Sequence, residues 1–170
     1  VQSEFSLWSR NVEIAVLDTC DKLGIAFVAF SPLARGFLTA VDLELETLAE
    51  KDIRRGMPRF QEPHLSANRQ WLPDFREIAA DADCTPAQLA LAWVLGKNDN
   101  IHVIPGTTSV DHLADDVGAL DVELSDAIVD RLDALINQDT VSGPRYPAPT
   151  QAEIDTEEYE VTATKQRSHG

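Results

Sequence analysis

Cysteine and long apolar runs are both scarce in this sequence. Its two cysteines, Cys20 and Cys84, lack the spacing of a metal site, which favours reduced core thiols in a cytoplasmic protein. No apolar run approaches the length that spans a bilayer, and no segment resembles a signal peptide. Because the chain begins at Val1, inside a predicted strand, we expect a fragment of a longer protein.

Positive charge is scarce as well. The chain has 14 lysines and arginines against 29 aspartates and glutamates, which gives a formal net charge of −15. Such a chain repels nucleic acid and anionic membranes, so neither is expected as a partner. The length of 170 residues suits one modest domain or a piece of a larger one, and the hydrophobic fraction of 44% is typical of a globular protein.

Strand and helix patterns alternate along residues 1–138. Short apolar runs predict strands, and the run IAFVAF is typical of a parallel strand that is covered on both faces; the strands are predicted over 1–7, 25–30 and 101–104. Apolar spacing, N-caps and glycine stops predict helices over 11–23, 71–82, 85–96, 109–120 and from 125 onward. The predicted N-caps include Thr85 and Ser125; Pro86 follows Thr85 at the first helical position, and Gln88 completes a capping box. This alternation predicts an α/β fold with a parallel sheet. Residues 139–170 are expected to form an irregular tail that is disordered near Gly170.

The stretch around Pro105 and Gly106 is the most informative local signal. A strand ends there, and Thr107, Thr108 and Ser109 lead into a helix with Ser109 as its N-cap. Unpaired N–H groups and the positive end of the helix dipole would then point at one spot among three hydroxyls, which favours an anion site. The alternative is an ordinary strand-to-helix turn with a good cap.

The connection over 39–70 is long and poorly periodic, and such connections are usually functional or mobile. It holds four cations within nine residues of an acidic chain: Lys51, Arg54, Arg55 and Arg59. One interpretation is a solvated loop. The other is a flap that brings guanidinium groups, Arg54 and Arg59 among them, to a bound anion. The sequence alone leaves both open.

Five segments, in order and with matching spacing, resemble the C-terminal part of the aldo-keto reductase family: VQSEFSLWSR, LGIAFVAFSPLARGFLT, DIRRGMPRF, TPAQLALAWVL and IPGTTSVDHLADD. The resemblance covers roughly residues 1–135. It implies the C-terminal portion of a (β/α)8 TIM barrel, with about three βα units (the sixth to the eighth), an extra helix and the irregular tail. Active sites of such barrels lie at the carboxyl ends of the strands. Members that act on pyridoxal or small aldehydes are the most similar.

The resemblance also implies a nicotinamide cofactor, NADP(H) or alternatively NAD(H). It matches Gln2 to the residue that binds the carboxamide, and Phe30 to an aromatic ring that stacks on the nicotinamide. The pyrophosphate loop corresponds to Ser31, Pro32, Leu33, Ala34, Arg35 and Gly36. The adenosine end and its 2′-phosphate correspond to Gly106, Thr107, Thr108, His112, Asp115 and Asp116. Without the resemblance, Phe30 would be a core residue, His112 a surface histidine and Gln2 a polar residue at a strand end.

The catalytic residues of the family have no counterpart in this chain. The resemblance implies an acidic tyrosine, assisted by a lysine, an aspartate and a histidine, all on earlier strands. Here Tyr146 and Tyr159 lie in the tail, and no lysine falls at a matching position. No metal cluster, nucleophile elbow or Walker loop replaces them in the sequence.

We therefore expect an NADP(H)-dependent enzyme that reduces small aldehydes or ketones to alcohols, with this chain as its inactive, cofactor-binding part. The expected partners are the small carbonyl substrate and the missing N-terminal part of the barrel. The alternative is a regulatory or redox-sensing protein on the same scaffold, which holds the cofactor without turnover. A tyrosine and a lysine at the strand ends of the missing part would favour the enzyme.

Overall fold

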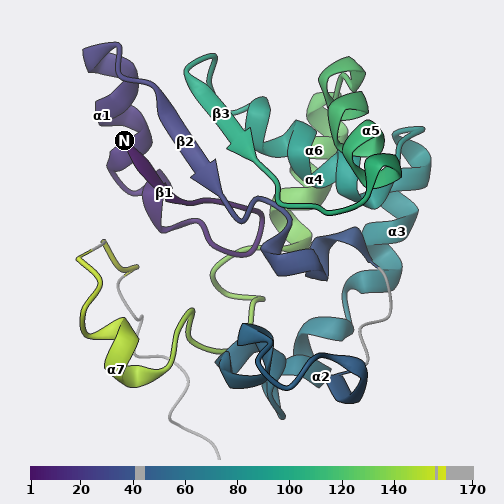
Figure 1. Cartoon of the computed structure of the whole chain (residues 1–170). Helices are drawn as coiled ribbons and strands as arrows, with labels where there is room; N and C mark the ends of the chain where they lie inside the picture. The colour runs from purple at the N-terminus through teal and green to yellow at the C-terminus, as the bar shows by residue number, and fades with distance from the viewer. Residues whose placement is uncertain (41–44, 156, 160–170) are drawn as a thin grey trace, which may run out of the picture.

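Three parallel strands form the sheet of this computed structural model (Figure 1). The structure describes residues 1–40, 45–155 and 157–159. In sheet order, the strands are β1 (Gln2–Glu4), β2 (Phe27–Phe30) and β3 (Ile101–Ile104). Phe30 pairs with Glu4 on one side and with Ile104 on the other, so the three carboxyl ends are level. The predicted parallel sheet is confirmed, although β1 and β2 are shorter than expected.

The described part of the chain contains seven α-helices. They are α1 (Val16–Leu23), α2 (His64–Arg69), α3 (Leu72–Asp81), α4 (Pro86–Leu95), α5 (Val110–Gly118), α6 (Asp126–Leu135) and α7 (Ala148–Gln151). The predicted N-caps Thr85, Ser109 and Ser125 each accept a hydrogen bond from a first-turn N–H, and Thr85 forms the predicted capping box with Gln88. Gly24 ends α1 in the left-handed conformation. The predicted first helix is wrong at its start, because Asn11–Glu13 forms a separate 3₁₀ turn.

The core is built around α4, which packs against β3, α3 and α5. Its side chains are buried almost all round, because the segment LALAWV over 89–94 carries no charge. The ring of Trp93 lies 5.5 Å from that of Phe5, which continues β1, and Phe5 in turn contacts Phe27 of β2. Burial of these rings against α4 joins the first and second strands to the helical layer.

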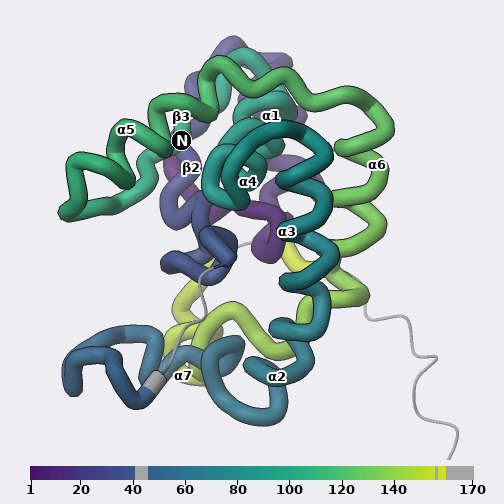
Figure 2. The backbone as a smooth tube through the Cα atoms, turned by 90° about the vertical axis from the view of Figure 1, so that its right-hand side faces the viewer, coloured from purple at the N-terminus to yellow at the C-terminus, as the bar shows by residue number. Residues whose placement is uncertain are grey.

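A second aromatic cluster fixes the long connection between β2 and α3. Trp8 stacks on Phe37 at 4.7 Å, and Phe37 meets Trp71 edge-on at 5.3 Å. Phe60 packs edge-on against both Trp8 and Phe37. In Figure 2, α2 and the turns of the connection group at one end of the molecule, below α3, α4 and α6. The described part of this connection consists of short 3₁₀ turns and α2 rather than an open loop.

The segment after α6 returns to the body of the protein. The buried side chain of Asn68 in α2 donates to the carbonyl of Ser142 at 3.0 Å and accepts from its N–H at 2.7 Å. The next residue, Gly143, has a φ of 92°, and a Cβ there would lie 2.8 Å from His64. Apart from α7 this segment is irregular. The predicted disorder near Gly170 lies outside the described residues.

The outer face of α5 remains apolar and exposed. Val110 and Leu113 are 81% and 52% exposed, and Val117 and Leu120 continue the same stripe at helical spacing. No helix in the described ranges is both long enough and apolar enough to cross a membrane.

Candidate functional site

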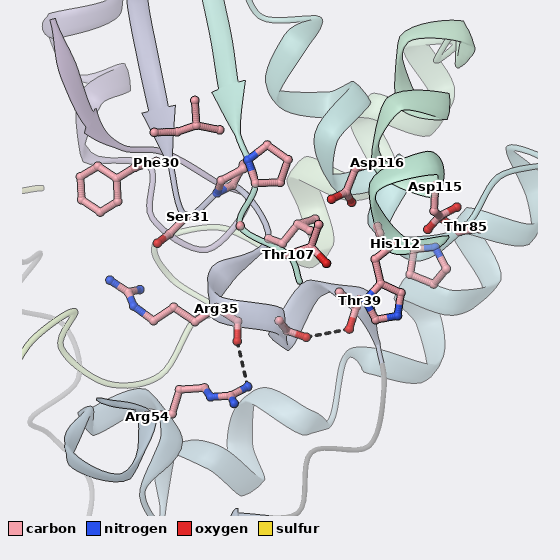
Figure 3. A pocket seen from close by; sticks show the side chains of 18 of the residues that line it. Phe30, Ser31, Arg35, Thr39, Arg54, Thr85, Thr107, His112, Asp115 and Asp116 are labelled. Atoms are coloured by element: carbon pink, nitrogen blue, oxygen red, sulfur yellow. Dashed lines mark hydrogen bonds between the residues drawn. The ribbon is translucent and has the colours of Figure 1, made fainter. Parts of the chain in front are cut away.

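A cavity of about 880 Å³ opens where β2 and β3 end (Figure 3). Its volume falls within the range of roughly 300–1,000 Å³ that is common for small-molecule sites. Phe30 lies at one end and Asp115 with Thr85 at the other. Most of the predicted site residues line it: Phe30, Ser31, Pro32, Leu33, Arg35, Gly36, Arg54, Gly106, Thr107, His112, Asp115 and Asp116.

Four predicted site residues do not line this cavity. Gln2 is exposed at the start of β1, at the end of the strand away from the cavity. Ala34 is fully buried behind the loop, and Thr108 is exposed beside Thr107. Arg59 points into the protein, where it donates to the carbonyl of Trp8 and, at 3.1 Å, to that of Gly143. These hydrogen bonds tie Arg59 to the protein interior instead of the cavity, and burial lowers its pKa to about 10.

Among the four cations of the predicted flap, Arg54 lies at the cavity. Arg54 lines the cavity and is held by Asp52, which accepts from its Nε and Nη2 at 2.9 and 2.7 Å. These hydrogen bonds lower the pKa of Asp52 to about 2. Arg54 also donates to the carbonyl of Arg35 at 3.2 Å. Arg55, by contrast, lies at the surface and donates to backbone carbonyls such as that of Leu48.

The loop over 31–36 has an unusual backbone. Ser31, Ala34 and Arg35 adopt left-handed conformations with φ of 51°, 51° and 57°, and Gly36 follows at 90°. Non-glycine residues in this region carry a cost of roughly 1–2 kcal/mol each, and such strain concentrates at functional sites. The loop therefore needs support from its surroundings to keep this shape.

That support comes from a buried carboxylate. Glu4 has a fully buried side chain at the carboxyl end of β1. The Nη1 and Nη2 atoms of Arg35 donate to its two oxygens at 3.0 and 2.8 Å. Arg145, Tyr146 and Ser9 donate to the same carboxylate, each at 2.9 Å. Burial acts to raise the pKa of Glu4, but the Arg35 hydrogen bonds and the nearby guanidinium charges outweigh it and hold this pKa at about 2.

The opposite end of the cavity is formed by the start of α5. The Ser109 hydroxyl accepts from the N–H of His112 at 3.3 Å, and the Thr107 hydroxyl accepts from the N–H of Ser109 at 3.1 Å. The Asp115 carboxylate accepts from the Thr85 hydroxyl at 3.0 Å. Burial and the charge of Asp115 raise the pKa of Asp116.

The charges around the cavity are mixed. Three carboxylates line it, those of Asp52, Asp115 and Asp116, against two guanidiniums. Both guanidiniums are already engaged, Arg35 with Glu4 and Arg54 with Asp52. Free positive charge is therefore scarce around the cavity, and of the three hydroxyls at the predicted anion site it is that of Thr107 that lines it.

Sequence reasoning missed several lining residues. The sequence predicts Thr85 and Pro86 only as the cap and first turn of a helix. The available signal was that the helix before a parallel strand starts near the carboxyl ends of the strands. Asp52 and Ile53 reach the cavity because the connection folds back over it, which no local pattern predicts. The remaining additions are Thr39, Ala87, Ile104 and Pro105.

Comparison with known proteins identifies the fold. The family model described as the aldo/keto reductase family matches residues 1–137. A thermostable aldo-keto reductase in complex with the inhibitor epalrestat is 28% identical, with a TM-score of 0.54 over 79% of this chain and 38% of that one. An aldo/keto reductase from Klebsiella pneumoniae in complex with NADP and acetate is 25% identical, with a TM-score of 0.57 over 86% of this chain and 42% of that one.

A third solved structure shares the fold. The glycerol dehydrogenase from Gluconobacter oxydans is 23% identical, with a TM-score of 0.71 over 86% of this chain and 44% of that one. The chain thus covers less than half the length of each of these structures. The family resemblance and an α/β fold of the TIM-barrel family are confirmed.

The Glu4 cluster predicts an acid-sensitive stability. Because the pKa of Glu4 is about 2 when folded and 4.5 in the absence of the fold, its contribution is complete above pH 4.5 and is lost as the pH falls toward 2. This shift corresponds to about 3 kcal/mol of unfolding free energy. Glu4→Gln removes this part of the pH dependence. Urea unfolding across that pH range measures it, with Glu13→Gln, at the bidentate Arg10 pair, as the control. An unchanged acid loss in Glu4→Gln would contradict the assignment.

Proposed function

Since the chain belongs to the aldo/keto reductase family, we propose that it is the cofactor-binding portion of an NADP(H)-dependent reductase that converts small aldehydes or ketones to alcohols. The observation that carries this proposal is the cavity at the level strand ends, where the loop over 31–36 and the start of α5 face each other. Its three strands would be the sixth to eighth of a (β/α)8 barrel. We propose a cytoplasmic location for it.

The residues around the cavity fit a dinucleotide in shape and chemistry. Phe30 supplies a flat aromatic face at one end, which suits a nicotinamide ring. The start of α5, with Thr107 and the Ser109 cap, suits a phosphate at the other end. A nicotinamide cofactor would supply the hydride for carbonyl reduction when bound.

Each protein group then has a defined task. The strained loop with Arg35 and Gly36 lets the backbone approach the pyrophosphate, and Arg54 closes the cavity from the connection. His112 and Thr107 face the ribose and its 2′-phosphate. Asp116 would accept a hydrogen bond from the adenine, although burial and the charge of Asp115 disfavour its ionised form and so raise its pKa.

The remainder of the barrel would cover what this chain leaves open. The exposed apolar stripe of α5, which includes Val110 and Leu113, has the chemistry of a helix that packs against a neighbouring unit. The outer edges of β1 and β3 carry no strand partner within the described ranges. The tyrosine, lysine, aspartate and histidine of the reaction would lie on that remainder.

The function is tested on the protein that contains this chain. We expect it to bind NADPH and to oxidise it in the presence of small aldehydes or ketones, followed by loss of NADPH absorbance. If the protein binds the cofactor but reduces none of these carbonyl compounds, the result would favour the regulatory or redox-sensing alternative over the reductase. Absence of binding to either nicotinamide cofactor would overturn the proposal as a whole.

Arg54→Ala is expected to weaken NADPH binding and to speed its release. The variant removes a guanidinium that lines the cavity and braces the Arg35 carbonyl. A hydrogen bond to a charged group contributes about 1.5–3 kcal/mol, so the dissociation constant should rise about tenfold or more. Stopped-flow fluorescence measures both quantities. Arg55→Ala is the matched control, because Arg55 lies outside the cavity lining; equal effects of the two variants would contradict the role of Arg54.

Thr108→Lys tests the choice between NADPH and NADH. Thr108 offers no positive charge beside Thr107, and Asp115 and Asp116 add negative charge at this end of the cavity, so we expect weak discrimination against NADH. The variant should tighten NADPH about ten- to a hundredfold and leave NADH nearly unchanged. Calorimetric titration of both cofactors measures this, with Thr150→Lys on α7 as the control for net charge. Equal effects on the two cofactors would place Thr108 away from the 2′ position.

A further inference from the structure

We propose that Glu4 is a positioning residue for the cofactor loop, and that Arg145 and Tyr146 of the C-terminal segment set the shape of this loop through Glu4 and Arg35. The inference rests on the proposed function only for its effect on cofactor binding. Neither Glu4 nor the two C-terminal residues line the cavity. Their influence on the site therefore passes through residues that do.

Arg35 is the link between Glu4 and the cavity. Its side chain is 11% exposed and bonds both oxygens of the fully buried Glu4 carboxylate, so the plane of its guanidinium is fixed. Its backbone carbonyl faces the other way and accepts from Arg54. Arg35 is thus held at both ends, with its left-handed backbone between them.

The loop has little support of its own. The N–H groups of Gly36 and Leu38 both donate to the carbonyl of Leu33, at 2.9 and 3.2 Å, and no side chain caps the start of this turn. At its other end the Thr39 hydroxyl donates to the carbonyl of Gly36 at 2.8 Å. The left-handed backbone conformations of Ala34 and Arg35 carry a conformational free-energy cost that these hydrogen bonds must offset. The Glu4–Arg35 pair supplies the external restraint that such a backbone requires.

The C-terminal segment completes the restraint from a distance of more than 100 residues along the chain. The Tyr146 hydroxyl donates to Glu4 at 2.9 Å and accepts from Nη2 of Arg35 at 3.1 Å, so it bridges the two partners of the ion pair. Arg145 donates to Glu4 and lies 6.0 Å from the centre of the Phe30 ring. The C-terminal segment therefore contacts the Glu4–Arg35 ion pair and also Phe30, the residue expected to stack on the nicotinamide.

Tyr146→Phe tests this link with little change in volume. It removes both hydrogen bonds of the hydroxyl and keeps the ring beside Arg35. The matched control is Tyr159→Phe, the same change in the same segment, because the Tyr159 hydroxyl donates to the Arg10 carbonyl instead. The protein that contains the chain is used for both variants.

The first measurement is amide hydrogen exchange without cofactor. In Tyr146→Phe the Gly36 and Leu38 amides should exchange about tenfold faster, because a hydrogen bond to a charged partner is lost and the loop opens locally. Amides inside α4 should keep their protection, which separates local loosening from general destabilisation. Unchanged exchange at Gly36 and Leu38, or equal acceleration in Tyr159→Phe, would overturn the inference whether or not the protein binds a cofactor.

The second measurement is NADPH affinity. Tyr146→Phe should raise the dissociation constant about three- to tenfold, mainly through faster release, and should have no further effect in an Arg35→Met background. Arg145→Lys, which keeps the charge but loses the Nε–H donor, should act in the same direction, with Arg131→Lys at the surface pair with Asp81 as its control. Additive effects of Tyr146→Phe and Arg35→Met would overturn the route through Arg35. Loss of NADPH binding in the unmodified protein would instead overturn the proposed function.

Discussion

The carboxylate of Glu4 is the interaction on which the site depends. A buried carboxylate is costly unless it is paired and fully hydrogen-bonded, and Glu4 meets both conditions with donors from four other residues. Removing one partner of such a cluster leaves another charge uncompensated, so its members hold one another in place. The cluster thereby fixes a strand end, a strained loop and the C-terminal segment relative to one another.

The level strand ends explain why one carboxylate can serve all three. Glu4 pairs with Phe30 in the parallel register, and Ser31 begins the loop directly afterwards. Because β1 carries Glu4 on a buried face and β2 carries Phe30 into the cavity, the restraint lies just behind the surface that it supports. Glu4 therefore lies outside the cavity, although it pairs with Phe30, which lines the cavity.

The sequence predicted features whose causes are local. The strand over 101–104, the Pro105–Gly106 turn and the Ser109 cap follow from neighbouring residues, and the structure has them as expected. The place of Arg59 could not be predicted, because its acceptors Trp8 and Gly143 are 51 and 84 residues away. For the same reason Arg54 and Arg59 look alike in sequence and lie in different surroundings. The candidate site was found mostly through family motifs, whereas Asp52 and Ile53 were missed because long-range folding brings them to the cavity.

The glycine at position 143 has a mechanical consequence for the C-terminal segment. Its positive φ and its close approach to His64 leave no room for a side chain, and Asn68 clamps the preceding residue on both backbone atoms. The chain is therefore pinned two residues before Arg145. The position of Arg145 and Tyr146 relative to Glu4 therefore depends on α2, through His64 and Asn68, as well as on the C-terminal segment itself.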